Sequence, residues 1–133
     1  MSIVIAVYNG GPDLERCLAG VAALDYTRME CILVDDASTD GVAAKLAGLY
    51  DLQLISLDRQ SGPAHARNVG GMHARGDILF FTDADVVLHP QALTEATAGF
   101  ASAENIAAVF GSYDTEPGDP ALVSQYRNLL HHW

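Results

Sequence analysis

Two acidic residues near the middle of the chain have the type and spacing of a metal site. Asp83 and Asp85 flank a small alanine directly after the apolar run of residues 78–82. Mg²⁺ and Mn²⁺ prefer oxygen ligands, and one or two carboxylates commonly hold them together with waters and substrate phosphates. The pair therefore suggests Mg²⁺ or Mn²⁺ as a cofactor. The alternative is a turn capped by Asp83 with a solvated charge at Asp85, and the motif alone does not decide between the two.

A second acidic cluster lies at residues 35–40, with the sequence DDASTD, after another apolar run. A carboxylate can accept a hydrogen bond from the imide N–H of uracil or thymine, or from a ribose hydroxyl. The same residues could instead begin a helix, with Ser38 or Thr39 as the cap and Asp40 favouring the helix dipole. We expect both to hold in part, so that Asp36 contacts a ligand and the following residues cap the helix.

Residues 62–71, with the sequence GPAHARNVGG, combine small residues with one cation. Small residues allow a backbone to approach a ligand closely, so Arg67 is a candidate for contact with a nucleotide. Taken alone, a solvated helix charge is the commoner explanation for Arg67. Gly70 and Gly71 each cost a helix about 1 kcal/mol relative to alanine, and close packing against a sheet would account for them.

The segments between these clusters alternate between strand and helix patterns. Residues 2–7 form an almost continuous β-branched run, which is typical of a strand buried on both faces of a parallel sheet. Expected strands cover residues 2–7, 31–34, 52–57, 78–82 and 106–113, and expected helices follow each of them, the last one carrying Leu122, Tyr126, Leu129 and Trp133. This order predicts an α/β domain with a mainly parallel sheet. The polar clusters follow strands, so they should meet at the carboxyl edge of the sheet, where such sheets bind ligands.

Composition and charge narrow the class of protein. The 133 residues, 50% of them hydrophobic, fit one domain with a buried core. The net charge of −10 argues against general nucleic-acid binding, because no positive surface is available to neutralise phosphates. No apolar run reaches the roughly 20 residues needed to cross a bilayer. No secretory signal opens the chain, so a cytoplasmic location is expected, which is compatible with peripheral membrane attachment of a longer protein.

The cysteines and histidines do not suggest a soft-metal or redox site. Cys17 and Cys31 lack the number and spacing of a disulfide framework or a zinc site, and both are expected to be buried thiols. None of the five histidines is assigned a ligand role, because none has the spacing of a metal site. No nucleophile elbow, Walker or dinucleotide glycine motif is present, which disfavours hydrolases, kinases and dehydrogenases.

Four short segments, in order along the chain, resemble the large inverting GT-A family of glycosyltransferases, which includes the cellulose, chitin and hyaluronan synthases. They are residues 3–10 (IVIAVYNG), 34–41 (VDDASTDG), 62–70 (GPAHARNVG) and 81–85 (FTDAD). Each motif is weak alone, but four in the right order are specific. The resemblance runs from residue 3 to at least residue 113 and implies a Rossmann-like GT-A sheet flanked by helices.

The resemblance also implies roles for individual residues in binding a nucleoside-diphosphate sugar. UDP is the expected nucleotide, although members of the family also use GDP- and dTDP-sugars. The residues implied to bind substrate are Ala6, Val7 and Tyr8 along the base, Asp36 on the uracil imide, Arg67 near the nucleotide, and Asp83 near the ribose and metal. Asp85 would be the main metal ligand, helped by Asp83. The donor sugar and a sugar, lipid or protein acceptor cannot be read from these residues.

Members of this family carry a second half with a general base that deprotonates the acceptor. Nothing after Asp85 matches it, because Asp114, Glu116 and Asp119 come too early in the chain. Residues 1–133 are therefore expected to be the nucleotide-sugar-binding part of a catalytic domain, truncated, inactive alone, and with the base beyond Trp133. An uncovered apolar stripe on the last helix suggests homodimerisation. The alternatives are a sugar nucleotidyltransferase, which would carry a basic loop after the first strand, and a non-catalytic nucleotide-binding module.

Overall fold

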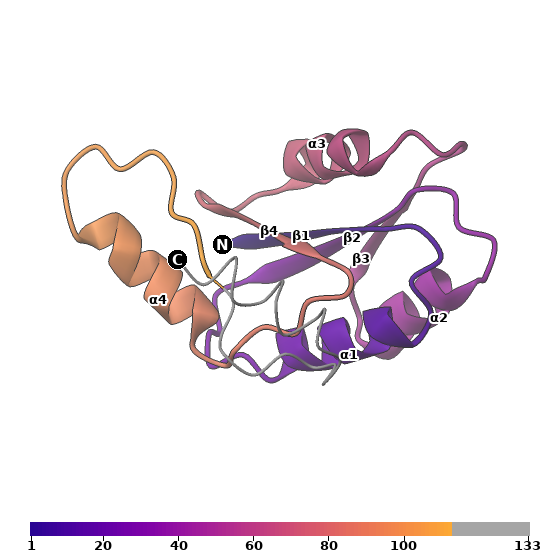
Figure 1. Cartoon of the computed structure of the whole chain (residues 1–133), viewed down its shortest axis with the longest axis horizontal. Helices are drawn as coiled ribbons and strands as arrows, with labels where there is room; N and C mark the ends of the chain where they lie inside the picture. Colours follow the sequence, from indigo (N-terminus) through magenta and orange to yellow (C-terminus); the bar gives the residue numbers. More distant parts are fainter. Residues whose placement is uncertain (113–133) are drawn as a thin grey trace, which may run out of the picture. The chain divides into compact units, whose positions relative to one another are not determined.

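A computed structural model describes residues 1–112 of the chain (Figure 1). The chain divides into two compact units, Met1–Leu93 and Thr94–Trp133, and each is described by itself. The elements are β1 (Ser2–Val7), α1 (Gly11–Ala22), β2 (Glu30–Asp35), α2 (Val42–Leu49), β3 (Gln53–Ser56), α3 (Pro63–His73), β4 (Leu79–Asp83) and α4 (Ala92–Ala101). The expected alternation of strands and helices is confirmed as far as α4.

The sheet of the first unit has four strands in the order β3-β2-β1-β4, and all three pairings are parallel. The predicted parallel α/β class is therefore confirmed. β1 is central, and its residues Val4 and Ile5 are fully buried, as its β-branched sequence predicts. The register pairs Ala6 with Asp83 on one side of β1, and Val7 with Asp35 on the other. Acidic residues from β2 and β4 thus flank the end of β1.

Helices cover both faces of this sheet. α1 and α2 lie on one face, and α3 lies on the other (Figure 1). The chain moves from β1 through β2 to β3, then returns past β1 to reach β4. Because crossovers between parallel strands are right-handed, this reversal of direction places α3 on the face opposite to α1 and α2. It also creates a switch point between β1 and β4, where open α/β sheets bind ligands.

The packing of α3 on the sheet explains one of its two adjacent glycines. A Cβ atom on Gly70 would lie 2.4 Å from Val4 Cγ1 and 3.0 Å from Val34 Cγ2. A side chain cannot fit there, so α3 approaches the strands as closely as its backbone allows. A Cβ on Gly71 would lie 3.5 Å from Leu79 Cδ1, which is an ordinary contact. The predicted close packing is therefore confirmed for Gly70, whereas Gly71 is not required by contacts of this kind.

The second unit corrects one expectation. Residues 106–112 form no strand, although their apolar sequence predicts one, and Tyr113 lies outside the described residues. A strand needs a partner for its backbone N–H and C=O groups, and no described strand pairs with this segment. Instead, Val109 lies close to Gly99 of α4, where an added Cβ would meet Val109 Cγ1 at 3.0 Å.

Two further expectations concern membrane segments and the end of the chain. Within residues 1–112, no helix combines the length and apolar character that a bilayer span requires. The apolar stripe proposed for self-association, from Leu122 to Trp133, lies outside the described residues, so the expected homodimer stays a prediction.

Candidate functional site

The loops that follow the four strands meet at the carboxyl edge of the sheet, because the strands are all parallel. The polar residues in the loops after β1 and β2 contact one another directly. The Asn9 backbone N–H donates to Ser38 Oγ at 2.8 Å, and the Asn9 side-chain oxygen accepts from the Thr39 N–H at 2.9 Å. The sequence does not assign Asn9 a role, although an asparagine directly after a strand is well suited to bonding a neighbouring backbone.

Asp36 connects the end of β2 to the loop that precedes α3. Its Oδ1 accepts from the Ser61 N–H at 2.7 Å, and its Oδ2 accepts from the Gly62 N–H at 2.8 Å. Only 3% of Asp36 is exposed. Gly62 has φ of +90°, a conformation that favours glycine and turns its N–H toward the carboxylate. Asp36 therefore fixes the entrance to α3 as well as lying at the candidate site.

The helix cap that the sequence predicts at Ser38 or Thr39 is not found at the start of α2. The cap residue of α2 is Gly41, and no side chain caps it. Ser38 and Thr39 instead bond to Asn9 in the neighbouring loop. Asp40 does serve the helix start, since its Oδ1 accepts from the Val42 N–H at 3.0 Å. The cap prediction was thus wrong for Ser38 and Thr39 because these side chains bind a loop that is distant in sequence.

The structure brings Arg67 and Asp83 together. The Arg67 guanidinium, from the second turn of α3, donates to Asp83 Oδ1 at the end of β4. Arg67 is therefore not merely a solvated helix charge. Among the described residues, the exposed Asp85 carboxylate forms neither a hydrogen bond nor an ion pair. The acidic pair thus contains one carboxylate with a cationic partner and one without.

Cys17 of α1 lies beneath this acidic pair. Its Sγ contacts the backbone oxygen of Asp83 at 3.5 Å. Burial, together with the negative charges of Asp85 and Asp83, raises the pKa of Cys17 to about 11. Cys17 and Cys31 are free and buried, as the sequence predicts.

The three residues expected along the base differ in their accessibility. Val7 is buried in the core, so only its backbone is available to a ligand, whereas Ala6 is half-buried. Tyr8 is 46% exposed, which leaves its ring accessible to a planar group. These three residues lie at the end of β1, at the switch point of the sheet.

The acidic residues offer few ligands for a metal ion. Among the described residues, no group of three or more His, Cys, Asp or Glu side chains could hold one. Asp83 and Asp85 supply two carboxylates with exposed side chains. This donor set fits a hard cation that takes its remaining oxygens from water and a diphosphate, as Mg²⁺ commonly does. It does not fit a cation held by protein ligands alone.

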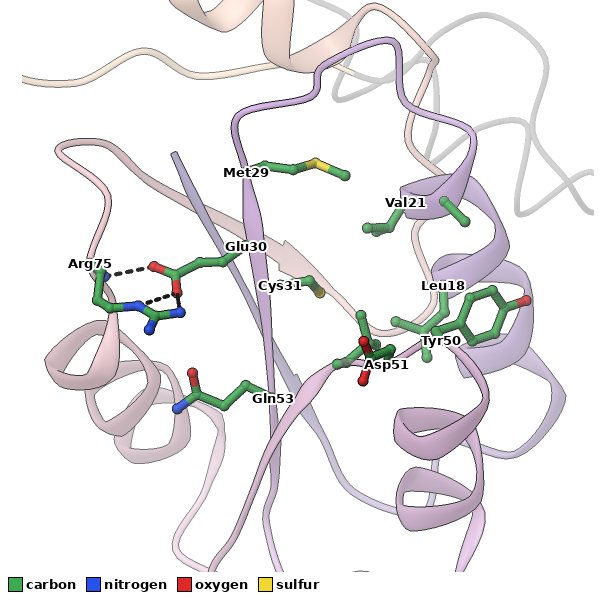
Figure 2. Close-up of a pocket in the computed structure, with 11 residues that line it drawn as sticks. Leu18, Val21, Met29, Glu30, Cys31, Tyr50, Asp51, Gln53 and Arg75 are labelled. Carbon is green, nitrogen blue, oxygen red and sulfur yellow. Dashed lines mark hydrogen bonds and ion pairs between the residues drawn. The ribbon is translucent and has the colours of Figure 1, made fainter.

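The opposite, amino edge of the sheet carries a groove of about 530 Å³ (Figure 2). It is lined by the ends of α1 and α2 and the starts of β2 and β3, and it includes none of the predicted site residues. Figure 2 also shows Glu30 held by Arg75, whose backbone N–H donates to Glu30 Oε1 at 2.7 Å. Ser2 Oγ donates to the same oxygen at 2.6 Å. The Ser2 hydroxyl and then the Arg75 backbone N–H lower the pKa of Glu30 to about 2.

Comparison with known proteins identifies the class and then the family. The parallel sheet with helices on both faces is that of the GT-A glycosyltransferases. A family profile described as "Glycosyl transferase family 2" matches residues 2–132. The chain therefore belongs to glycosyl transferase family 2.

Two curated relatives illustrate the similarity in sequence. The chain is 35% identical over 95 residues to the succinoglycan biosynthesis protein ExoO of Rhizobium meliloti, covering 70% of the chain and 27% of that protein. It is 35% identical over 97 residues to the glycosyltransferase AglE of Haloferax volcanii, covering 68% of the chain and 32% of that protein. The chain thus spans about a third or less of the length of each relative.

Two solved structures illustrate the similarity in fold. The mannosyltransferase PcManGT from Pyrobaculum calidifontis, in complex with GDP-Man and Mn²⁺, has a TM-score of 0.75 and 31% identity, over 96% of this chain and 37% of that chain. S. aureus TarS in complex with UDP-GlcNAc has a TM-score of 0.69 and 29% identity, over 73% of this chain and 30% of that chain. Proteins similar to this chain therefore bind nucleotide sugars.

Proposed function

We propose that this chain binds a nucleoside-diphosphate sugar, preferably UDP-linked, together with Mg²⁺ or Mn²⁺, as the donor-binding part of an inverting glycosyltransferase. The observation that carries this proposal is the Arg67–Asp83 ion pair at the carboxyl edge of a parallel sheet, with Asp36 and Asp85 directly after strands that end at the same edge. Similar structures that contain UDP-GlcNAc, or GDP-Man with Mn²⁺, support it.

The nucleoside end of the donor is assigned to the loops after β1 and β2. Asp36 uses one acceptor position on each carboxylate oxygen for the N–H groups of Ser61 and Gly62. Each oxygen has two lone pairs, so a further position is available for the uracil imide N–H. Tyr8 presents an accessible ring at the neighbouring strand end. Together these groups would recognise a planar base with an imide donor.

The diphosphate end of the donor is assigned to the loop after β4 and to α3. Asp85, with help from Asp83, would hold the divalent cation, which stabilises the negative charge of a departing diphosphate. Arg67 would supply the protein's own positive charge to the phosphates. With a net charge of −10, the chain needs such local positive charges to bind an anionic donor.

Sugar transfer with inversion also needs a general base that takes the proton of the acceptor hydroxyl. Such proton transfer contributes a factor of about 10² to 10⁴ in rate. No described residue at the site is assigned this role, and Asp114, Glu116 and Asp119 lie outside the described residues. We therefore propose that the residues at the carboxyl edge bind and orient the donor, and that the base comes from another part of the protein.

Binding calorimetry tests this function directly. UDP should bind more tightly than ADP, and Mn²⁺ or Mg²⁺ should strengthen the binding of UDP. Asp36→Ala should reduce the preference for UDP, whereas Asp85→Ala should remove the effect of the metal. Titration with GDP separates a uracil site from a guanine site. Equal affinity for UDP and ADP, with no dependence on metal, would overturn the assignment.

A further inference from the structure

The ion pair between Arg67 and Asp83 occupies a carboxylate that the proposed function assigns to the donor and its cation. Arg67 reaches Asp83 from α3, one turn before the closely packed Gly70. The helix is thus held against the sheet near the base of the arginine, while the guanidinium lies at the edge. Both side chains are accessible, with exposures of 34% for Arg67 and 55% for Asp83.

This ion pair is held by fewer bonds than the other Arg–carboxylate pair that joins α3 and its following loop to the sheet. Arg67 donates to Asp83 through one nitrogen, Nη2. Arg75 donates to Glu30 through its backbone N–H and through its Nε at 3.0 Å, and its Nη2 lies 2.8 Å from Glu30 Oε2 in an ion pair. A pair with a single contact and a third or more of each side chain exposed exchanges partners at little cost, because water and salt screen it.

A divalent cation on Asp83 would meet the positive charge of Arg67 at the same carboxylate. Like charges at that distance repel one another, so the cation and Arg67 compete for Asp83. A diphosphate changes this balance, because its oxygens offer the guanidinium a new anionic partner of matching geometry. The cation and the nucleotide therefore help each other to displace the ion pair.

We propose that Arg67 is an exchangeable counter-ion, which neutralises Asp83 in the ligand-free site and transfers to the diphosphate when nucleotide and cation bind. This inference rests on the proposed function. In this arrangement Arg67 weakens the binding of cation alone and makes the binding of cation and nucleotide mutually dependent. Because such coupling is reciprocal, each ligand raises the affinity for the other by the same factor.

The test measures Mn²⁺ affinity by electron paramagnetic resonance of unbound Mn²⁺, with and without saturating UDP, in the wild type and in Arg67→Gln. Without UDP, the variant should bind Mn²⁺ about 5-fold more tightly, which corresponds to the loss of one exposed ion pair. UDP raises Mn²⁺ affinity by a certain factor in the wild type, and in Arg67→Gln this factor should be at least about 5-fold smaller. Arg67→Lys keeps the positive charge, so it should bind Mn²⁺ alone no more tightly than the wild type.

A matched control removes the same charge from the other edge of the sheet. Arg75→Gln should leave both Mn²⁺ affinities unchanged, and thermal melts of all variants verify that they fold. If the wild type binds Mn²⁺ with UDP but Arg67→Gln does not tighten the binding of Mn²⁺ alone, the counter-ion role is wrong while the proposed function stands. If Mn²⁺ fails to bind the wild type even with UDP, the metal assignment and the counter-ion role are both wrong.

Discussion

Glu30 at the amino edge of the sheet receives more hydrogen bonds and ionic contacts than Asp83 and Asp85 at the carboxyl edge. At the amino edge, Glu30 accepts hydrogen bonds from Ser2 and from the backbone N–H and Nε of Arg75, and it forms an ion pair with Arg75 Nη2. The Gly76 N–H donates to Ser2 Oγ at 2.8 Å. At the carboxyl edge, Asp83 has a single cationic contact, and Asp85 has no hydrogen-bonding or ionic partner among the described residues. Glu30 is thus satisfied by the protein's own donors, whereas Asp83 and Asp85 leave most of their acceptor positions open within the described part of the chain.

This difference separates carboxylates that stabilise the fold from carboxylates that are open to a ligand. We call the network of Ser2, Glu30 and Arg75 the amino-edge clamp. The amino-edge clamp ties the loop after α3 to the starts of β1 and β2, and little of its hydrogen-bonding capacity is left for a ligand. At the carboxyl edge, Asp85 has no donor among the described residues, and a cation would offset the repulsion between its charge and that of Asp83. Asp36 differs from Asp83 and Asp85, because both of its oxygens already accept backbone N–H groups. The following substitutions test whether this contrast holds.

The largest loss of stability is expected at Asp36. In Asp36→Asn, an amide NH₂ must face either the Ser61 or the Gly62 N–H, so a buried donor loses its acceptor. We expect the free energy of unfolding to fall by about 3 kcal/mol, measured by urea denaturation. Asp35→Asn is the control, because Asp35 is only half-buried and, within residues 1–112, its side chain accepts from the Ser38 N–H alone. Equal losses in both variants would mean that Asp36 does not hold the loop.

Glu30→Gln should destabilise the amino-edge clamp by about 2 kcal/mol, because hydrogen bonds to a charged group are lost. The folded-state pKa of Glu30, about 2, lies below the ordinary value of 4.5. Its contribution is therefore complete above pH 4.5 and is lost as the pH falls toward 2. The difference in stability between wild type and variant should shrink over this range. The exposed Glu15→Gln is the control, and a pH-independent difference for Glu30→Gln would contradict the clamp.

Substitutions of Gly70 and Gly71 test how closely α3 packs against the sheet. Gly70→Ala introduces a Cβ within 2.4 Å of Val4 Cγ1, so we expect a loss of about 1 to 2 kcal/mol from overpacking. Gly71→Ala meets only an ordinary contact and gains helix propensity, which should stabilise the chain by up to about 1 kcal/mol. Thermal melts of the two variants should therefore shift in opposite directions. A shift in the same direction would show that α3 is not seated against Val4.

The smallest change in stability is expected at Asp85. Asp85→Asn removes an exposed charge without a hydrogen-bonding partner in the described chain, so the free energy of unfolding should change by no more than about 0.5 kcal/mol. The same variant should lose the effect of Mn²⁺ on UDP binding. Denaturation and calorimetry on one preparation check both expectations. A large loss of stability would place Asp85 with the structural carboxylates.

Local sequence patterns predict the parts of this molecule that depend on neighbouring residues. The β-branched run of β1 and the polar residues after each strand lie where the sequence places them. Contacts between distant segments could not be predicted in the same way. The Arg67–Asp83 pair depends on how α3 crosses the sheet, and the Asn9–Ser38 bond depends on the register of β1 and β2.

Residues 106–112 show that the sequence can also predict a strand where none forms. Their apolar composition predicts a strand, but strand formation depends on a partner that the sequence of the segment does not encode. The roles of Ala6, Val7, Tyr8, Asp36, Arg67, Asp83 and Asp85 in ligand binding stay predictions.

The alkylation rates of the two buried thiols, Cys17 and Cys31, report how often the structure around each of them opens. Alkylating reagents attack the thiolate, and burial raises the pKa of Cys17 to about 11 and that of Cys31 to about 12. At neutral pH each thiol therefore reacts only when its surroundings open transiently. Cys17 lies under the carboxyl edge and Cys31 lies at the start of β2, beside the groove at the amino edge. The labelling rate of each cysteine would report the opening of the structure around it, and a nucleotide that binds the carboxyl edge should slow the labelling of Cys17 more than that of Cys31.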